Sequence, residues 1–548
     1  KCHQGEVEAE QPCSTTFSPD NWETIQIPHD WRNGCEVDRK NELPRQLVGK
    51  HLEKRDDSYL PRGTGWYYKT IPLDASFSGQ RIYIEFEGVF RNCTVWINGR
   101  QAGKHPYGYT GFVLDITPLV HFGGEPNILT VFVDARDVEG WWYDGAGIFR
   151  HVWLITTSPI HIDNWGTFVT TPVITPRSAK IQISIDIRNT TENISSCFLQ
   201  TDILNADNRI VAKTIKTVKI PAGSLKTFTQ KCTIRNPRRW SPDNPRLYRA
   251  RSTLMAGEQI IDSYDTVFGV RTFEFRADTG FYLNGKPLKL RGACVHHDYG
   301  GLGTALPPRA HEKTVETLKG IGSNIIRSSH NCAAPPLMEA CDQLGLLFWA
   351  ETRYLPLDPP EYTIPPLLEM IRRDRNHPCI ITWSLANTAG HPDGHLTEYL
   401  KKLNDAAHTA DPTRPTSVGL ELNADANANG FALVTDIVGY NGAGMKIDDR
   451  DHELYPERKM IISEYGAAPG VRGIYEIVHT DAAMAEIRTD GKKSLVGAYH
   501  SIKTQCERHE NNWKRVAERP WLAGGIIWVG MDHRGEGYGW PCAYSQLG

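Results

Sequence analysis

Residues able to perform acid–base or nucleophilic chemistry recur directly after short apolar segments in the second half of the chain. They are His296, His297 and Asp298; Arg327 and His330; Glu351; Asn387 and Thr388; Tyr440 and Asn441; Glu464 and Tyr465; and Trp528 and Asp532. Carboxylates, imidazoles, an arginine, amides and aromatic rings together suit a polar substrate that offers hydroxyls and a ring face, such as a sugar. Two carboxylates about 5–5.5 Å apart favour glycoside cleavage with retention, and about 6.5–9.5 Å favours inversion.

A scaffold must bring these segment ends together. Strand-like segments at 288–295, 324–326, 346–350, 379–385, 436–440, 460–463 and 524–529 alternate with helix-like segments at 311–319, 337–344, 367–375, 395–410 and 498–518. Seven or eight such units predict a C-terminal (β/α)₈ TIM barrel over residues 273–548, with its active site at the C-terminal ends of the strands. A doubly wound sheet is the alternative, but no glycine-rich phosphate turn follows the first strand, which argues against nucleotide binding.

The first half of the chain has the pattern of two β domains. In residues 1–155, Ile82, Ile84 and Phe86 alternate with polar residues, and Asn98-Gly99 is a hairpin signal. We expect a β-sandwich or an N-terminal β jelly roll there. In residues 156–272, strict alternation from Ile181 to Ile187 predicts an immunoglobulin-like β-sandwich. The predicted fold class is therefore multidomain: jelly roll, immunoglobulin-like sandwich and TIM barrel.

The composition excludes several classes of protein. The 548 residues hold 61 Lys and Arg against 64 Asp and Glu, a net charge of −3. This balance lacks the basic excess of a nucleic-acid binder. The mean hydropathy is −0.43, and no apolar run approaches the roughly 18 residues of a membrane span. We expect no nucleic-acid partner and no membrane span, while an oligomer stays possible.

The cysteines and the chain start indicate the cellular context. None of the 12 cysteines forms a C-x-x-C pair, so a zinc ribbon is not supported. Buried free thiols are the expectation, with a Cys2–Cys13 disulfide left open. The chain starts at Lys1 rather than Met, which favours a removed leader and a periplasmic or secreted location, with the cytoplasm as the alternative. Whether the C-terminus is trimmed is also left open.

Short motifs spread over nearly the whole chain resemble those of glycoside hydrolase family 2, the β-galactosidase, β-glucuronidase and β-mannosidase group. They are Ile27–Trp31, Gly65–Tyr67, Trp142–Tyr143, Gly147–Arg150, Arg291–Gly292, His296–Asp298, Asn324–Asn331, Arg373–Pro378, Trp383–Leu385 and Ser463–Gly466. The segment Asp56–Pro61 and the His-His-Asp run resemble β-galactosidase-like members from gut Bacteroidetes. The resemblance implies a retaining glycosidase that acts on the non-reducing end of an oligosaccharide or polysaccharide, without a cofactor.

The resemblance also implies residue roles. Glu464, at the end of the seventh barrel strand, matches the family's nucleophile, and Asn387 matches the asparagine that bonds the hydroxyl beside the anomeric carbon. The family's general acid/base is the Glu that directly follows this asparagine. Here that residue is Thr388, whose hydroxyl cannot protonate a leaving group near neutral pH.

Three interpretations of Thr388 remain open. A nearby group replaces the acid, with His391, Asp393, Asp298, Glu351 and His330 as the candidates. Alternatively, the chain is a catalytically impaired or purely carbohydrate-binding relative that keeps the sugar pocket. The third possibility is a deliberately inactivated enzyme or a substrate-assisted reaction. General acid–base catalysis contributes about 10²–10⁴-fold, so activity itself is in question.

The remaining candidates have both a binding and a structural interpretation. We expect His296, His330 and Glu351 to line the pocket, Arg327 to organise carboxylates or bind substrate, and Tyr440 to contact the nucleophile or the sugar. Trp528 is the expected stacking platform. Trp141, Trp142 and Tyr143 either line the rim or pack between domains, and Asp532 and Glu536 either reach substrate or are solvated.

Two further expectations concern metal binding and the identity of the sugar. A metal site at His296, His297 and Asp298 is disfavoured, because neighbouring strand residues point to opposite faces; no metal is predicted. The Ser-Glu-Tyr-Gly motif is typical of glucuronidases and the His-His-Asp run of galactosidases. A uronic-acid-specific enzyme is therefore the second choice after a β-galactosidase.

Overall fold

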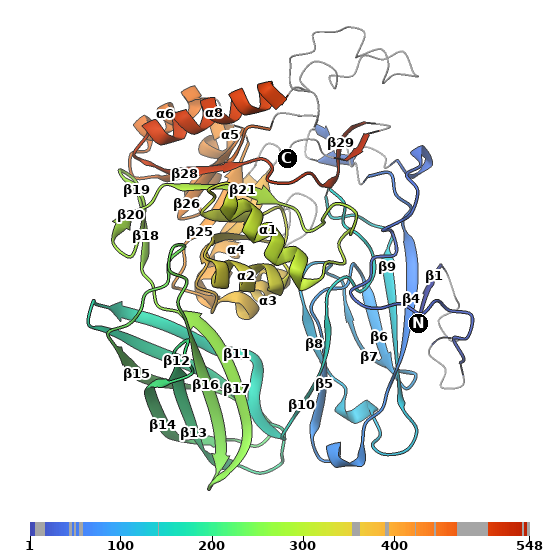
Figure 1. The fold of residues 1–548 in the computed structure, drawn as a ribbon. Helices are drawn as coiled ribbons and strands as arrows, with labels where there is room; N and C mark the ends of the chain where they lie inside the picture. The colour runs from blue at the N-terminus through green and yellow to red at the C-terminus, as the bar shows by residue number, and fades with distance from the viewer. Residues whose placement is uncertain are drawn as a thin grey trace.

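The computed structural model describes residues 1–5, 12, 17–42, 46–48, 51–53, 58–140, 142–352, 362–388, 394–421, 423–442, 445–467, 502–539 and 542–544. Three regions follow one another along the chain (Figure 1): a blue β region, a green β-sandwich and a barrel coloured from yellow-green to red. Both β regions lie against the barrel, and the jelly roll reaches toward the barrel's C-terminal loops. The predicted fold class is confirmed.

The N-terminal jelly roll contains two sheets, with strand orders β1-β4-β9-β6-β7 and β10-β5-β8. Their strands are β1 (Cys2–Gln4), β4 (Gly63–Ile71), β5 (Arg81–Phe86), β6 (Cys93–Ile97), β7 (Arg100–His105), β8 (Phe112–Asp115), β9 (Asn127–Ala135) and β10 (Val152–Thr157). A small pair, β2 (Gln46–Val48) and β3 (His51–Glu53), and the 3₁₀ turns η1 (Arg39–Asn41), η2 (Ala75–Phe77) and η3 (Thr117–Leu119) complete the region. The predicted alternation in β5 is confirmed, because Ile82, Ile84 and Phe86 are buried and their neighbours are only half-buried.

The second region is an immunoglobulin-like sandwich of two antiparallel sheets, β11-β12-β15 and β14-β13-β16-β17. The strands are β11 (Ile160–Ile174), β12 (Ser178–Asn189), β13 (Ser195–Leu204), β14 (Ile210–Ile220), β15 (Ser224–Arg235), β16 (Leu247–Ala256) and β17 (Gln259–Gly269). Ile181, Ile183, Ile185 and Ile187 all point into a core that the two sheets share. Each inward isoleucine removes its apolar surface from water, which stabilises the sandwich by about 1.5–3 kcal/mol per side chain.

The third region is a closed barrel of eight parallel strands. A small antiparallel sheet leads into it: β18 (Phe273–Arg276), β19 (Gly280–Leu283) and β20 (Lys286–Pro287). The barrel strands are β21 (Leu290–Val295), β22 (Ile325–Ser328), β23 (Leu347–Glu351), β24 (Ile380–Thr388), β25 (Thr416–Leu420), β26 (Ile437–Asn441), β27 (Lys459–Tyr465) and β28 (Leu522–Ile527). A hairpin of β29 (Arg534–Gly539) and β30 (Cys542–Tyr544) follows.

Helices cover the outside of the barrel. They are α1 (Pro308–Gly320), α2 (Pro335–Leu344), α3 (Ile364–Asp374), α4 (Gly394–Ala410), α5 (Asn423–Ala428), the 3₁₀ turn η6 (Phe431–Leu433), α6 (Met445–Leu454) and α8 (Ile502–Glu518). Helix α2 buries Leu337, Met338 and Cys341, as the sequence pattern predicts. It ends at Gly345, whose left-handed φ of +82° is a conformation that glycine adopts without strain.

The fifth barrel strand, β25, has no counterpart among the strands predicted from sequence. Its segment, Thr-Ser-Val-Gly-Leu, has only two strongly apolar residues, Val418 and Leu420, yet all five residues are buried. The polar members are satisfied inside the protein: the Thr382 hydroxyl donates to Ser417 Oγ at 2.9 Å, and the Thr416 amide donates to Asp436 at 2.8 Å. The strand is therefore stabilised by buried hydrogen bonds, which an apolar pattern does not indicate.

The jelly roll is bonded directly to the loops at the barrel mouth. Asp30 accepts hydrogen bonds from the backbone and hydroxyl of Thr304, at 3.1 and 2.9 Å, and from the Tyr143 hydroxyl at 2.7 Å. Arg150 donates to the Cys332 carbonyl at 2.7 Å. These contacts are buried, so the first region forms part of the wall beside the barrel's C-terminal ends.

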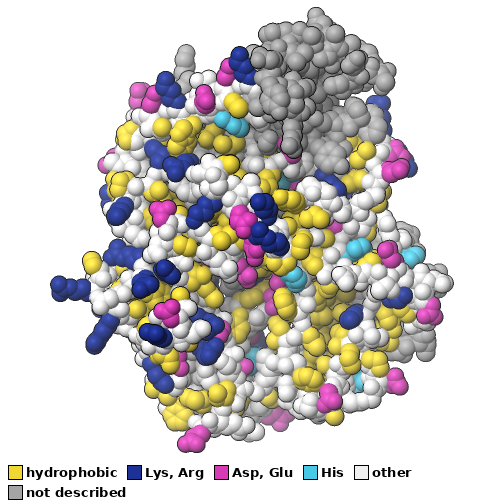
Figure 2. Space-filling model, viewed as in Figure 1, with side chains coloured by type: hydrophobic (Ala, Val, Ile, Leu, Met, Phe, Trp, Pro, Cys, Tyr) yellow, Lys and Arg dark blue, Asp and Glu magenta, His cyan; other side chains and the backbone are white. Residues whose placement is uncertain are grey.

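The state of the cysteines and the distribution of surface charge can be compared with what the composition predicts. Among the described residues ten cysteines are free thiols, Cys2 included, and most of them are buried; Cys13 lies outside the described residues. Charged side chains of both signs are interspersed on the visible face (Figure 2). Within the described part of the chain, no helix combines the length and apolar composition that crossing a bilayer requires.

Candidate active site

Arg327 is the centre of a buried polar cluster at the C-terminal ends of the barrel strands. Its guanidinium donates to both oxygens of Glu351, from Nε at 2.9 Å and from Nη2 at 3.1 Å, and to Glu464 Oε1 at 2.7 Å. It also donates to Asn387 Oδ1 and to the Ser463 carbonyl, both at 3.0 Å. The arginine side chain is fully buried, so it acts as the organiser of two carboxylates and an amide.

The two carboxylates in this cluster differ in what reaches them. Glu351 is completely buried, and besides Arg327 it is bonded to His330 Nδ1 at 2.6 Å and to the Ser384 hydroxyl at 2.8 Å. Glu464 keeps 14% of its side chain exposed. Glu351 is therefore enclosed by protein donors, whereas Glu464 can present an oxygen to a molecule in the barrel mouth.

Their pKa values move in opposite directions. Burial alone would raise the pKa of Glu351, but the Arg327 cation and the His330 hydrogen bond hold it below its usual value. Burial raises the pKa of Glu464 to about 8 against the opposing effect of Arg327, and the nearby carboxylates of Glu351 and Glu421 act in the same direction as burial. A strongly displaced pKa at a partly accessible carboxylate is a typical feature of a functional site.

A chain of amides and hydroxyls fixes Asn387 beside this pair. Asn441 Nδ2 donates to Asn387 Oδ1 at 2.6 Å, and the Ser463 hydroxyl donates to Asn441 Oδ1 at 2.7 Å. With Oδ1 occupied by two donors, the Asn387 Nδ2 group is oriented away from them and lies 3.4 Å from His330 Nε2. The pairing of β24 with β25 shifts register between Ser384 and Asn387, a feature common where a strand redirects a side chain toward a site.

An aromatic wall borders the cluster. The Trp528 and His330 rings are stacked, with centroids 5.1 Å apart and planes 7° from parallel. Trp142 of the jelly roll lies 5.5 Å from His330 by ring centroids, and its indole donates to the Tyr109 hydroxyl at 3.0 Å. Of the alternatives for Trp142, the structure places it both at the rim and in interdomain packing; Trp141 lies outside the described residues.

His296 and Asp298 line a cavity between the jelly roll and the barrel mouth. Neither buried ring nitrogen of His296 has a hydrogen-bond partner among the described residues, and the same holds for Asp298 Oδ1. Burial and the neighbouring His533 keep the pKa of His296 well below its usual value, so its ring is neutral. Buried polar atoms without partners are costly, and sugar hydroxyls entering from the mouth would satisfy them.

The structure does not bring Tyr440 to the cluster, so the expected contact with the nucleophile or the sugar is wrong. Its hydroxyl donates to Asp451 Oδ2 at 3.0 Å and accepts from Arg458 at 3.2 Å, on the side of β26 that faces the helices. Strand residues alternate between faces, so the next residue, Asn441, is the one that points inward.

The other predicted residues are placed as follows. Thr388 ends β24, and its side chain lies outside the described part of the structure, as do the side chain of Glu536 and both His391 and Asp393. Asp532 is exposed. Ser384 and Ser463 were not predicted, because a serine inside an apolar strand gives no signal of its own before its neighbours in space are known.

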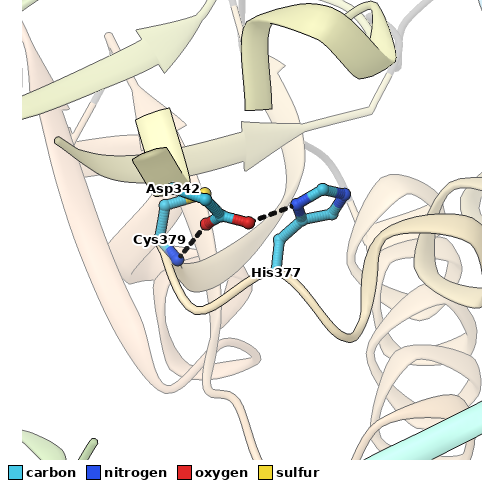
Figure 3. Close-up of side chains that lie close together, drawn as sticks. All are labelled: Asp342, His377 and Cys379. Atoms are coloured by element: carbon cyan, nitrogen blue, oxygen red, sulfur yellow. Dashed lines mark hydrogen bonds and ion pairs between the residues drawn. The ribbon is translucent and has the colours of Figure 1, made fainter. Parts of the chain in front are cut away.

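One group of side chains has suitable donors for a metal ion, but it lies at the opposite end of the barrel. Asp342, His377 and Cys379 have ligand atoms within 4.8 Å of one another (Figure 3). The Asp342 carboxylate already accepts from His377 Nδ1 at 2.6 Å and from the Cys379 amide at 2.9 Å, and burial raises the pKa of the Cys379 thiol. A protonated thiol and a fully bonded carboxylate fit a structural brace between α2 and β24 better than a metal site.

His296 and His297, the imidazoles for which a metal site is disfavoured, make different contacts. His297 bonds through Nε2 to the Asp144 carbonyl at 3.3 Å and through Nδ1 to Asn331 at 3.3 Å, while His296 stacks on His533 at 3.7 Å. The two imidazoles therefore face different surroundings.

Family models match three successive parts of the chain. The sugar binding domain of glycosyl hydrolases family 2 matches residues 20–158, a second family 2 model matches residues 160–271, and the family 2 TIM barrel domain matches residues 275–358 and 360–516.

Individual relatives carry related names. Beta-galactosidase BoGH2A of Bacteroides ovatus is 34% identical over 100% of this chain and 68% of its own length, and a beta-glucuronidase of Bacteroides fragilis is 30% identical over 94% and 74%. Among solved structures, a family 2 member from Bacteroides cellulosilyticus superposes with a TM-score of 0.83 at 30% identity over 99% of this chain, and Bacteroides uniformis beta-glucuronidase with 0.85 at 27% over 100%. The chain spans 66% of each of these two structures.

Proposed function

The chain belongs to glycosyl hydrolase family 2, and from this premise and the site geometry we propose that it is a retaining exo-β-glycosidase. The observation that carries the proposal is the Glu464 carboxylate, held at 2.7 Å by Arg327 and partly accessible at the barrel mouth. In the proposed reaction this carboxylate attacks the anomeric carbon of a terminal sugar, which forms a covalent glycosyl-enzyme and releases the leaving group.

The surrounding residues support the first step of this reaction. Arg327 fixes the nucleophile and favours its ionised form. Asn387, oriented by Asn441, presents its amide N–H groups to the hydroxyl next to the anomeric carbon. One face of the Trp528 ring stacks on His330, and the rest of the ring would contact the pyranose, since aromatic side chains suit amphipathic ligands. The sugar thus meets a carboxylate, an amide and an aromatic face within one mouth.

A neutral sugar, with galactose as the first choice, fits the charges better than a uronic acid. The N–H groups of Arg327 are committed to Glu351, Glu464, Asn387 and the Ser463 carbonyl, so this cation is not free to pair with a substrate carboxylate. Asp298 and Glu351 add negative charge nearby. The printed names of the relatives include both beta-galactosidase and beta-glucuronidase, so glucuronides are the matched comparison substrates.

The experiment is a comparison of 4-nitrophenyl β-galactoside and 4-nitrophenyl β-glucuronide as substrates, with the first-formed sugar anomer followed by proton NMR. We expect hydrolysis of the galactoside with the β-anomer appearing first. Release of the α-anomer would contradict a covalent intermediate on Glu464, and a preference for the glucuronide would overturn the choice of sugar.

A second candidate function is carbohydrate binding without catalysis, which Thr388 favours because the family's acid/base Glu is replaced. In that case galactose or its oligosaccharides would bind, and neither aryl glycoside would be cleaved above the rate of the Glu464→Gln variant. Binding without turnover would therefore replace the first proposal by the second.

A further inference from the structure

Strand β25 is followed directly by a carboxylate, Glu421, at a position that the family pattern does not indicate. Gly419 faces the cluster: a Cβ atom at this position would lie 2.7 Å from Asn387 Oδ1 and 3.0 Å from Arg327 Nη2. Because strand residues alternate, Leu420 faces the helix layer, where it is 1% exposed. The next residue, Glu421, comes directly after the end of β25, one step farther toward the open mouth.

The register of the barrel places this carboxylate beside the position of the missing one. Asn387 is the Cα partner of Gly419, and Thr388 is the Cα partner of Leu420. Adjacent strands lie about 4.7–4.9 Å apart. Glu421 therefore follows directly on the residue that pairs with Thr388, beside the strand that ends at Thr388 and one residue farther toward the mouth.

Two further properties of Glu421 suit proton transfer at the mouth. Its side chain is exposed, so it can exchange protons with solvent between the steps of a reaction. Its charge also reaches the nucleophile, since it is one of the groups that raise the pKa of Glu464.

We propose that Glu421 is the general acid/base of this enzyme and supplies from the fifth barrel strand the function that Thr388 cannot. The proposal rests on the glycosidase function proposed above. In the first step, a Glu464 oxygen bonds to the anomeric carbon, the bond to the leaving oxygen breaks, and that oxygen takes the proton of Glu421. In the second step, water attacks the anomeric carbon, its proton passes to the Glu421 carboxylate, and the bond to Glu464 breaks.

The other described candidates for the acid are less suited. Both oxygens of Glu351 accept hydrogen bonds from Arg327, and the side chain is fully buried with a lowered pKa. Asp298 is 9% exposed and accepts the Arg534 amide at 3.0 Å. His330 donates from Nδ1 to Glu351 at 2.6 Å, so this imidazole is already engaged inside the cluster. Glu421, by contrast, is exposed and its charge acts on Glu464.

The test compares Glu421→Gln with a matched control, Glu398→Gln, in the full chain. Glu398 is 68% exposed on α4 and bonds to Lys401, so its replacement removes the same charge from the outer helix layer. Each variant is assayed with the phenyl and 2,4-dinitrophenyl glycosides of the sugar that the wild type cleaves. These two leaving groups differ in how much they need protonation.

For Glu421→Gln we expect kcat/KM on the phenyl glycoside to fall about 10²–10⁴-fold, the usual contribution of a general acid. The loss on the dinitrophenyl glycoside is expected to stay below about tenfold in the same parameter, because dinitrophenolate leaves without a proton. The basic limb of the pH profile of kcat/KM should disappear in this variant and persist in Glu398→Gln.

A smaller variant adds a readout that a purely structural role would not produce. In Glu421→Ala, azide can enter the space of the carboxylate and attack the glycosyl-enzyme without needing a base. We expect added azide to raise turnover of the dinitrophenyl glycoside and to yield a β-glycosyl azide. Equal losses on both leaving groups together with no glycosyl azide would overturn the proposal, as would a Glu421→Gln variant with wild-type rates.

Failure of this inference is distinguishable from failure of the proposed function. If Glu464 forms a covalent adduct but Glu421→Gln is unaffected, the enzyme is a retaining glycosidase whose acid lies elsewhere, and Asp393→Asn and His391→Ala become the next variants. If wild type turns over neither leaving group, the glycosidase function itself is wrong.

Discussion

Two clusters with buried carboxylates occupy opposite ends of the barrel, and they differ in how the buried negative charge is neutralised. At the lower end, Asp342 is 2% exposed and bonded to His377 Nδ1 and to the Cys379 amide (Figure 3). At the mouth, one cation, Arg327, holds two carboxylates, Glu351 and Glu464. In the cluster around Asp342, one carboxylate has its own histidine and amide donors. In the cluster around Arg327, two carboxylates share one cation, so their negative charge is only partly compensated.

This difference in charge compensation indicates that the Asp342 cluster stabilises the fold, whereas the cluster around Arg327 suits the proposed chemistry. The Asp342 carboxylate holds the pKa of His377 above its usual value despite burial, so the pair favours the folded state. At the mouth, burial raises the pKa of Glu464 to about 8, so the folded protein disfavours the ionised form that the proposed attack requires.

The largest expected effect is on activity at the mouth. Glu464→Gln should lower kcat by about 10⁶-fold, the order seen when a catalytic nucleophile is removed, while the thermal unfolding temperature at pH 8 stays at least that of wild type. Steady-state rates and calorimetry on the same sample measure both quantities. A loss below tenfold would show that Glu464 is not the attacking group.

The next effect is on stability at the lower end. Asp342→Ala leaves the buried Cys379 amide and His377 without their acceptor, and it should lower the free energy of unfolding by about 3–5 kcal/mol. Activity per folded molecule should stay within about twofold, since the barrel mouth is untouched. Urea unfolding together with an active-site titration separates the two. His377→Ala, which keeps the bond to the Cys379 amide, should be less damaging; a large drop in kcat for Asp342→Ala would break the distinction between the clusters.

A pH series sharpens the same comparison. The pKa of Glu464 is about 8 in the folded protein and about 4.3 in an unfolded chain, so between these values the folded state holds the extra proton. Stability contributed by this group therefore decreases as the pH rises through that window, by at most about 1.4 kcal/mol per pH unit. Glu464→Gln lacks this effect, and its unfolding temperature relative to wild type should increase from pH 5 to pH 8. A constant difference would place the pKa of Glu464 in its ordinary range.

The smallest expected effect concerns Thr388. If Glu421 already supplies the acid, Thr388→Glu should change kcat/KM on a phenyl glycoside by less than about tenfold, or about 1.4 kcal/mol. A gain of about 10²-fold or more would mean that the wild-type site lacks an acid. In that case the contrast between the two clusters would stand, but the role of Glu421 would not.

Much of the barrel can be predicted from the sequence, because each strand is marked by a short apolar run of neighbouring residues. The apolar runs ending at Arg327, Glu351, Asn387 and Glu464 predict parallel strands, and parallel strands in a barrel must present their following residues at one end. The structure does gather them: Arg327 donates hydrogen bonds to Glu351, Glu464 and Asn387. Their chemical roles remain proposals.

The parts that sequence reasoning missed depend on contacts across the barrel. The apolar pattern does not reveal strand β25, because Thr416, Ser417 and Gly419 interrupt it. All three residues are nevertheless buried, and Thr416 and Ser417 form hydrogen bonds to neighbouring segments of the barrel. With that strand unrecognised, Glu421 is not seen as a strand-end residue. Tyr440 was assigned to the wrong face, because an inward or outward orientation depends on register, and a shift of one residue reverses it.

The covalent intermediate tests the central claim most directly. Wild-type protein is incubated with the 2,4-dinitrophenyl 2-deoxy-2-fluoro-β-galactoside, whose glycosyl-enzyme hydrolyses slowly, and peptides are then mapped by mass spectrometry. The account predicts one added fluorosugar, on the peptide that contains Glu464, and none in the Glu464→Gln variant. A fluorosugar on another carboxylate, or an active enzyme that never acquires one, would contradict it.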